Sequence, residues 1–181
     1  EPQVLIDSDD VATMFFTSGT ESAPKGVLTS HANFYASHLA WALNFGLAQD
    51  DRLLMSLPLI HVAGYLFSTY ALANQVTMVM TQVPQPVQMI DLVARHRLSV
   101  TVLPPTLYVA MLSCPNFGTS DLRCVTKLGT WASTIPRSMI DGWKQASPSS
   151  RFFSVQGSSE STASLLTGGW VDGWEQMPNQ D

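Results

Sequence analysis

A loop rich in hydroxyl groups and glycine is the first place where this sequence could do chemistry. Residues 17–27, TSGTESAPKGV, follow directly on the apolar run VATMFF. The groups that suit a phosphate are the hydroxyls of Thr17, Ser18 and Thr20, the flexible backbone at Gly19 and Gly26, and the charge of Lys25. Backbone N–H groups in such a turn form an anion-binding nest, and a lysine adds a point charge. The loop therefore predicts a phosphate site.

The loop matches neither of two common phosphate-binding patterns. A P-loop needs a second glycine directly before the lysine, but counting from Gly19 places Pro24 where that glycine should be. A GxGxxG dinucleotide turn is absent as well. Composition alone leaves a solvated Ser/Gly/Pro loop as an equal alternative.

Two further polar residues follow in segments of similar character. The segment PLIHVAGY (58–65) places His61 at the start of an apolar helix, where a helix cap or a core residue is the ordinary role. The segment VQGSSEST (155–162) places Glu160 after a strand, where a solvated carboxylate is the ordinary role. Neither residue indicates a site by itself.

Strands alternate with helices along the chain, which predicts βαβ units and an α/β fold with a largely parallel sheet flanked by helices. Strands are expected at 11–18, 51–57, 76–81, 99–104, 122–129 and 151–157, and helices at 30–45, 61–73, 86–98, 105–114 and 136–146. Ser30 is a plausible N-cap and Gly46 a plausible helix stop. Ligands bind at the carboxyl ends of strands in such sheets. The loops 17–26, 58–64 and 157–162 are therefore expected to form the site.

These segments resemble the signatures of the adenylate-forming (AMP-binding) enzyme superfamily, in its acyl- and aryl-CoA synthetase branch. The first loop is similar to the family pattern Thr/Ser-Ser-Gly-Ser/Thr-Thr-Gly-x-Pro-Lys-Gly. The matching residues are Thr17, Ser18, Gly19, Thr20, Pro24, Lys25 and Gly26. Glu21 replaces the usual threonine and Ser22 the usual glycine.

The resemblance extends to the other two segments and implies roles for their residues. PLIHVAGY resembles the Pro-Leu/Met-Phe-His-x-x-Gly segment, which implies that His61 lines the place where the carboxylate meets the α-phosphate. VQGSSEST resembles Tyr-Gly-x-Thr-Glu, with Gly157 and Glu160 matching and Ser159 keeping the hydroxyl. Glu160 would then help to hold Mg²⁺. Gln156 departs from the aromatic residue that stacks on adenine in the family.

The segment LGTWASTIP (128–136) stands where the family has a turn beside the adenine and acyl pocket. The resemblance implies a substrate pocket that includes Thr130, Trp131 and Ala132. Trp131 has two interpretations that the sequence leaves open, because it could narrow an acyl tunnel or pack in a core.

The resemblance implies a reaction with ATP, Mg²⁺ and coenzyme A. A fatty or aryl acid would be activated to an acyl-adenylate and then transferred to coenzyme A or a carrier thiol. Peptide-synthetase domains carry an aspartate in the segment around His61, and none lies between Leu53 and Ala73, which argues against an amino-acid substrate.

We expect residues 1–181 to form a single partial domain, the central portion of the large N-terminal domain of an adenylate-forming enzyme. The N-terminal subdomain and the C-terminal lid of the family have no counterpart in the sequence. The isolated chain is therefore expected to be inactive and to depend on the missing subdomains of its parent. A catalytically silent homologue serving as a binding or scaffold domain is the alternative, supported by Glu21, Ser22 and Gln156.

Composition excludes other classes of function. The net charge is −5 and no basic cluster occurs, which argues against nucleic acid. The apolar stretch from Val62 to Ala73 is too short to span a bilayer, so no integral membrane contact is expected. Cys114 and Cys124 match neither a disulfide framework nor a zinc site, which favours a cytoplasmic location.

Glu21 generates a prediction, because a carboxylate in a phosphate nest repels the phosphates unless it points to solvent or meets a metal. If Glu21 has weakened an inherited site, Glu21→Thr should bind Mg-ATP more tightly than the unaltered chain. Calorimetric titration of both chains measures this difference. Equal affinities of the two chains for Mg-ATP would show that Glu21 does not affect nucleotide binding.

Overall fold

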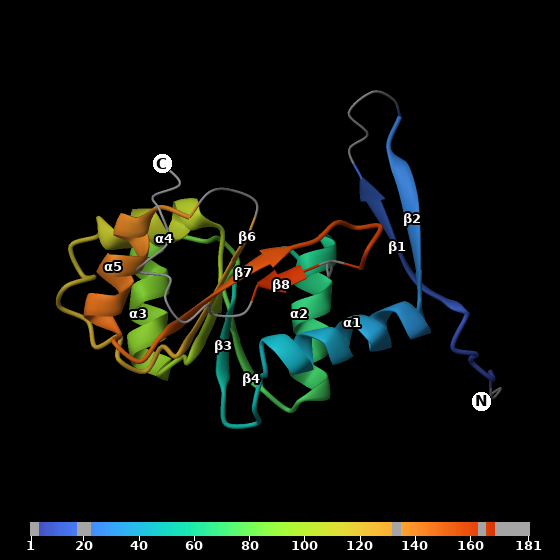
Figure 1. Cartoon of the computed structure of the whole chain (residues 1–181), viewed down its shortest axis with the longest axis horizontal. Helices are drawn as coiled ribbons and strands as arrows, with labels where there is room; N and C mark the ends of the chain where they lie inside the picture. The colour runs from blue at the N-terminus through green and yellow to red at the C-terminus, as the bar shows by residue number, and fades with distance from the viewer. Residues whose placement is uncertain (1–3, 18–22, 132–134, 163–165, 169–181) are drawn as a thin grey trace.

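The computed structural model describes residues 4–17, 23–131, 135–162 and 166–168. The strands are β1 (Val11–Thr17), β2 (Lys25–Ser30), β3 (Arg52–Met55), β4 (Thr77–Met80), β5 (Val100–Val102), β6 (Lys127–Trp131), β7 (Arg151–Gln156) and β8 (Leu166–Gly168). The helices are α1 (His31–Asn44), α2 (Val62–Ala73), α3 (Pro86–His96), α4 (Pro105–Leu112) and α5 (Arg137–Ala146). Figure 1 shows their arrangement.

A six-stranded sheet with the order β4-β3-β5-β6-β7-β8 forms the centre of the molecule. The strands β4, β3, β5, β6 and β7 run parallel, and β8 is antiparallel to β7. The predicted α/β class with a largely parallel sheet is confirmed. Because the strands are parallel, the segments that follow β3, β6 and β7 all leave the same edge of the sheet.

Both faces of this sheet are covered, and successive side chains of a strand point to opposite faces. Leu53 and Met55 belong to a core cluster with residues of α1 and α2, whereas Leu54 belongs to a second cluster with α3, α4 and α5. Phe153 and Phe152 divide between the two clusters in the same way. The result is a layer of helices on each side of the sheet (Figure 1).

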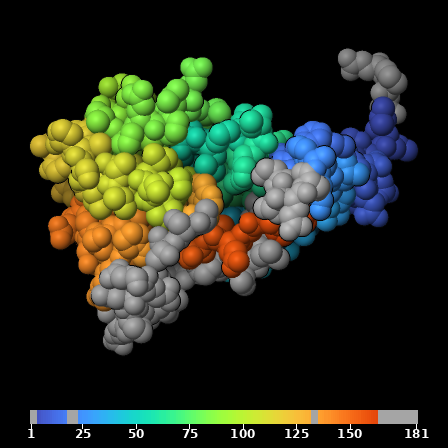
Figure 2. Space-filling view, turned by 90° about the horizontal axis from the view of Figure 1, so that it is seen from above, coloured from blue at the N-terminus to red at the C-terminus, as the bar shows by residue number. Residues whose placement is uncertain are grey.

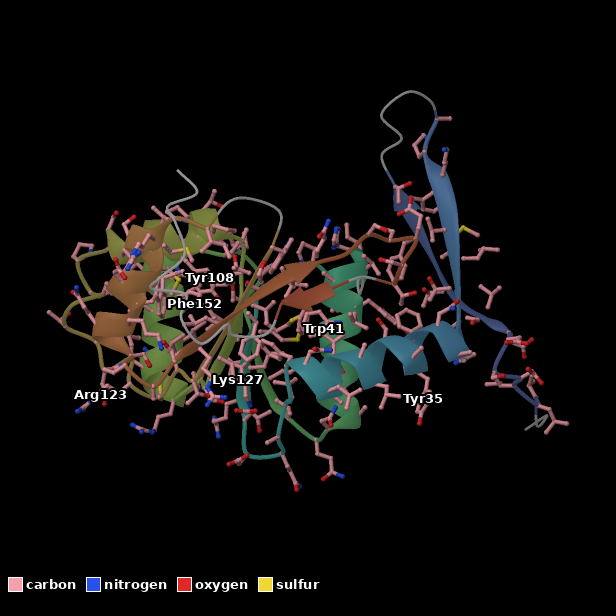
Figure 3. All side chains as sticks on the ribbon, viewed as in Figure 1. Tyr35, Trp41, Tyr108, Arg123, Lys127 and Phe152 are labelled. Atoms are coloured by element: carbon pink, nitrogen blue, oxygen red, sulfur yellow. The ribbon has the colours of Figure 1, made fainter. Side chains whose placement is uncertain are left out.

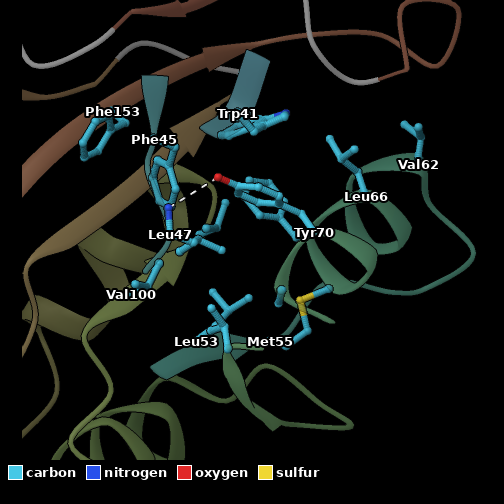
Figure 4. Packing of buried hydrophobic residues seen from close by; sticks show 14 of the residues in the cluster. Trp41, Phe45, Leu47, Leu53, Met55, Val62, Leu66, Tyr70, Val100 and Phe153 are labelled. Carbon is cyan, nitrogen blue, oxygen red and sulfur yellow. Dashed lines mark hydrogen bonds between the residues drawn. The ribbon is translucent and has the colours of Figure 1, made fainter. Parts of the chain in front are cut away.

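Aromatic side chains fill the first of these clusters. Trp41 of α1 packs edge-on against Phe67 of α2, with 4.6 Å between the ring centroids. The Tyr70 hydroxyl accepts a hydrogen bond from the Leu47 N–H at 3.4 Å, which satisfies a buried polar group inside the cluster (Figure 4). These contacts place α2 against α1 and the segment that follows it.

The first strand departs from the prediction. Residues 11–18 were expected to form a buried strand of the parallel sheet, but β1 pairs with β2 as a separate antiparallel hairpin. Only Phe15 of β1 is buried, and Phe16 is 73% exposed. The strand β2 was not predicted either, because Lys25 and Gly26 were assigned to the loop 17–26, Ser30 to the helix after it, and residues 27–29 to no element. Figure 2 shows this hairpin at one end of the molecule, away from α3, α4 and α5.

The limits of α1 confirm two sequence predictions. Ser30 caps the helix, since its hydroxyl accepts from the Asn33 N–H at 3.3 Å while the Asn33 carboxamide accepts from the Ser30 N–H at 3.0 Å. Gly46 ends it with a φ of +59°, a left-handed conformation that glycine adopts without strain.

Two smaller differences lie near the end of the described chain. The strand expected at 122–129 begins only at Lys127, because residues 122–126 form a turn closed by a hydrogen bond from the Val125 N–H to the Leu122 carbonyl at 3.0 Å. The short strand β8 was not predicted.

Packing between α1 and α2 predicts a pH-dependent stability. Nε2 of His38 lies 3.0 Å from the Thr69 hydroxyl, and its ring contacts Phe34 and Tyr70. Burial lowers the pKa of His38 below its ordinary value of 6.5, so the unfolded chain binds the proton more tightly. The free energy of unfolding should therefore be highest above about pH 6.5, where His38 is neutral in both states, and should fall at lower pH as the unfolded chain takes up the proton. His38→Gln should flatten this fall in urea titrations between pH 7.5 and 5, whereas the exposed control His31→Gln should not. Parallel curves for all three chains would contradict the assignment.

Candidate functional site

The hairpin holds both ends of the proposed phosphate loop. Thr17 ends β1 and pairs with Lys25 at the start of β2, and the Lys25 side chain is exposed. Ser18, Gly19, Thr20 and Glu21 lie outside the described residues. The loop therefore joins two antiparallel strands, and its lysine stands at the base of the turn.

Gly26 lies in a strand rather than in the flexible part of the loop. It pairs with Phe16, and a Cβ on Gly26 would approach the Met14 sulfur to 3.0 Å. A glycine here suits cross-strand packing against a large side chain. The expectation that Gly26 supplies loop flexibility is therefore wrong.

His61 occupies the N-cap position of α2 and its side chain is exposed. Its Nδ1 accepts a hydrogen bond from the Ala63 N–H at 3.2 Å. Because Nδ1 acts as an acceptor, the neutral ring carries its proton on Nε2, which remains a donor. The cap and a role in orienting a carboxylate are thus compatible in one side chain.

Gly64 explains the spacing of the segment that carries His61. The His61 N–H donates to the Pro58 carbonyl at 3.0 Å, which folds residues 58–61 into a turn lying against the start of α2. A Cβ on Gly64 would lie 2.1 Å from the Pro58 oxygen. Only glycine permits this approach, so the proline, histidine and glycine of the motif form one local structure.

Tyr65 links this segment to the hairpin. Its ring centroid lies 5.7 Å from that of Phe15 in β1 and 5.0 Å from that of Phe34 in α1. Such aromatic contacts are specific in geometry and contribute beyond the area they bury. They place the first turn of α2 beside β1, the strand that precedes the candidate phosphate loop. Sequence reasoning missed Tyr65, since no pattern distinguishes it from other aromatic core residues.

The loop after β7 holds Glu160 in a tight turn. The Ser158 and Ser161 hydroxyls exchange hydrogen bonds with each other's backbone N–H groups, at 3.3 and 3.0 Å, and the Thr162 N–H donates to the Ser159 carbonyl at 3.1 Å. Ser159 is half-buried, while Gly157 and Glu160 are exposed. The exposed carboxylate is free to meet a cation from solution.

The surroundings of Glu160 favour its ionised carboxylate. Hydrogen bonds from its own N–H and from Ser158 lower the pKa of Glu160, and the charge of Lys25 lowers it further. The loop extends from β7 toward the hairpin, as Figure 1 shows. The loop that carries Glu160 and the hairpin that carries Lys25 are far apart in the sequence, but both lie on the side of the molecule opposite α3 and α5.

The predicted substrate-pocket residues lie at the end of β6. The Thr130 side chain is fully buried, and its hydroxyl has no hydrogen-bond partner among the described residues. Trp131 is half-buried and packs against the core cluster beside α1 and α2. Ala132 lies outside the described residues.

Within the described residues, no group of three or more histidine, cysteine or acidic side chains gathers to hold a metal. A lone carboxylate still fits a magnesium ion bound to nucleotide phosphates, because Mg²⁺ uses one or two protein carboxylates in such sites. None of the described helices has the length and apolar character needed to cross a bilayer.

The fold and site define an α/β domain with a candidate phosphate- and cation-binding region beside the carboxyl edge of a mostly parallel sheet. The model of the AMP-binding enzyme family matches residues 1–180, and the chain belongs to this family.

The relatives of this chain include proteins named as CoA ligases or as CoA ligase-like. A 2-succinylbenzoate–CoA ligase from Bacillus velezensis is 30% identical over 136 residues, covering 75% of this chain. A 4-coumarate–CoA ligase-like protein from Arabidopsis thaliana is 29% identical over 161 residues, covering 87%. The matched segment spans 28% of the length of each of these relatives.

Solved structures share the fold. The N-terminal domain of FACL13 from Mycobacterium tuberculosis superposes with a TM-score of 0.89 at 23% identity, covering 97% of this chain and 44% of that one. O-succinylbenzoate coenzyme A synthetase from Bacillus subtilis, in complex with ATP and magnesium ion, gives a TM-score of 0.82 at 23% identity and covers 98% of this chain and 36% of that one.

The turn around Gly64 predicts a large effect of a small substitution. Gly64→Ala should lower the free energy of unfolding by about 1–3 kcal/mol, because the backbone of Pro58 must move to admit the methyl group. Gly118→Ala is the matched control, since no atom lies within 4 Å of its added Cβ. Urea unfolding of both variants measures the difference, and equal stabilities would contradict the close approach.

Proposed function

We propose that the parent protein activates a carboxylic acid with Mg-ATP to an acyl-adenylate and transfers the acyl group to coenzyme A. The observation that carries the proposal is the packing of the hairpin that bears Lys25 against the segment that bears His61, through the ring contact of Phe15 with Tyr65 at 5.7 Å. Lys25 at the base of the hairpin loop suits a nucleotide phosphate, and the exposed carboxylate of Glu160 suits its magnesium ion. The CoA-ligase names of the relatives support the same reaction class.

Each motif has one part in this reaction, and most of the catalysis would come from positioning and charge stabilisation. Residues 17–26 would hold the β- and γ-phosphates, with Lys25 as the cation. Glu160 and Ser159 would hold Mg²⁺ and the phosphates. His61 would donate from Nε2 to the attacking carboxylate, because its Nδ1 is engaged by the Ala63 N–H.

The surroundings of His61 favour an acid with an apolar body, fatty or aryl. A hollow of about 530 Å³ lies between β1 and the segment around His61. Its lining is mainly apolar and includes Phe15, Phe16, Leu59, Ile60 and Tyr65. Such a lining favours hydrocarbon over charged groups.

A catalytically silent relative that binds partners is the second candidate. Gln156 is exposed at the end of β7, where the resemblance places an aromatic residue against adenine. Mg-ATP binding by this chain therefore separates the two candidates.

Calorimetric titration of Mg-ATP tests the proposal. The unaltered chain should bind, and Lys25→Gln should bind about 10- to 100-fold more weakly, as expected for one charge-assisted hydrogen bond. Arg123→Gln is the matched control, because it also removes one exposed positive charge but lies far from the hairpin (Figure 3). Equal losses in both variants would contradict the specific role of Lys25, whereas no binding by the unaltered chain would favour the silent relative.

A further inference from the structure

A buried hydrogen bond joins α1 to the loop that carries Glu160. The Ser37 hydroxyl donates to the Thr162 carbonyl at 2.8 Å, across a separation of 125 residues. The two residues are 4% and 6% exposed. The bond connects α1, which follows the β1–β2 hairpin, with the loop that follows β7.

The residue type at position 37 is unexpected for its place in the helix. Ser37 shares the buried face of α1 with Phe34 and Trp41, where an apolar side chain would be the ordinary choice. A buried hydroxyl costs stability unless it is hydrogen-bonded, and helical serines often bond to a carbonyl of their own helix. Ser37 instead bonds to another element, which gives this hydroxyl a tertiary role.

Thr162 needs an outside contact of this kind. Its φ is +54°, in the left-handed region that a β-branched residue rarely adopts. Such a conformation persists when surrounding contacts hold it. The bond from Ser37 holds its carbonyl and thereby fixes the end of the Glu160 turn.

The same helix is rigidly connected to the phosphate hairpin. Ser30 is both the last residue of β2 and the N-cap of α1, closed by the reciprocal bonds with Asn33. A continuous path therefore runs from Lys25 along β2 and α1 to Ser37, and across one hydrogen bond to the Glu160 loop.

We propose that Ser37 is a positioning residue, which holds the Glu160 loop against α1 and so determines how well the chain holds magnesium on a bound nucleotide. This inference rests on the proposed function. It assigns to Ser37 no contact with nucleotide or metal.

The test compares ATP binding with Mg²⁺ and with EDTA. Ser37→Ala should weaken Mg-ATP binding about fivefold, the change expected from one neutral hydrogen bond, and should leave binding in EDTA unchanged. Ser68→Ala is the matched control, because the Ser68 hydroxyl is buried in α2 without a hydrogen-bond partner among the described residues. That variant should bind as the unaltered chain does.

A double-mutant cycle with Glu160→Gln separates positioning from a general structural defect. Ser37→Ala should add little further loss once Glu160 is already Gln, since both changes act through the same carboxylate. The same fivefold loss in that background, or an equal loss in EDTA, would overturn the proposal.

Hydrogen exchange without nucleotide gives an independent readout. Amides of residues 157–162 should exchange faster in Ser37→Ala than in the unaltered chain and in Ser68→Ala. Equal exchange rates in all three would overturn the positioning role. Failure of the unaltered chain to bind Mg-ATP, by contrast, would count against the proposed function, while the exchange rates would still decide whether Ser37 holds the loop.

Discussion

The arrangement of the candidate site depends on how the β1–β2 hairpin is held, because the main sheet does not include it. A two-stranded hairpin is marginally stable by itself, so side-chain contacts must set its position. Phe15 supplies them by packing against Tyr65, which also contacts Phe34 of α1. The hairpin that carries the candidate phosphate loop is therefore placed by an aromatic cluster rather than by backbone pairing with the main sheet.

The same packing includes the segment that carries His61. Tyr65 lies one turn after His61, so the aromatic cluster also places the histidine beside the hairpin. The Glu160 loop follows β7, which lies near the opposite edge of the sheet from β3. It contacts α1 through the hydrogen bond of Ser37. The parallel strands deliver two of the motifs to one edge, and α1 and α2 connect that edge to the hairpin. Fold and site are thus linked through the two helices on one face of the sheet.

Several motif residues have structural explanations that stand beside their proposed roles. Gly64 is required by the close approach of the Pro58 carbonyl, and Gly26 lies in a strand close to the Met14 side chain. His61 caps a helix while keeping Nε2 as a donor. These residues would be favoured for local folding even without a ligand. The proposed function therefore rests on the packing of the hairpin that bears Lys25 against the His61 segment, through the contact of Phe15 with Tyr65.

The sequence by itself determined the alternation of strands and helices, the α/β class, the cap at Ser30 and the stop at Gly46, because periodicity, capping and turn chemistry are local properties. It also identified the family, since the motifs are contiguous. Only the tertiary structure decided that β1 and β2 form a separate hairpin, because the apolar run VATMFF is compatible with either kind of strand. The roles of Tyr65 and of the Ser37–Thr162 bond came from the tertiary structure too, since partners so distant in the chain leave no mark in local pattern. A serine on the apolar face of α1 was the one signal that the sequence offered, and its meaning depended on the loop that packs against it.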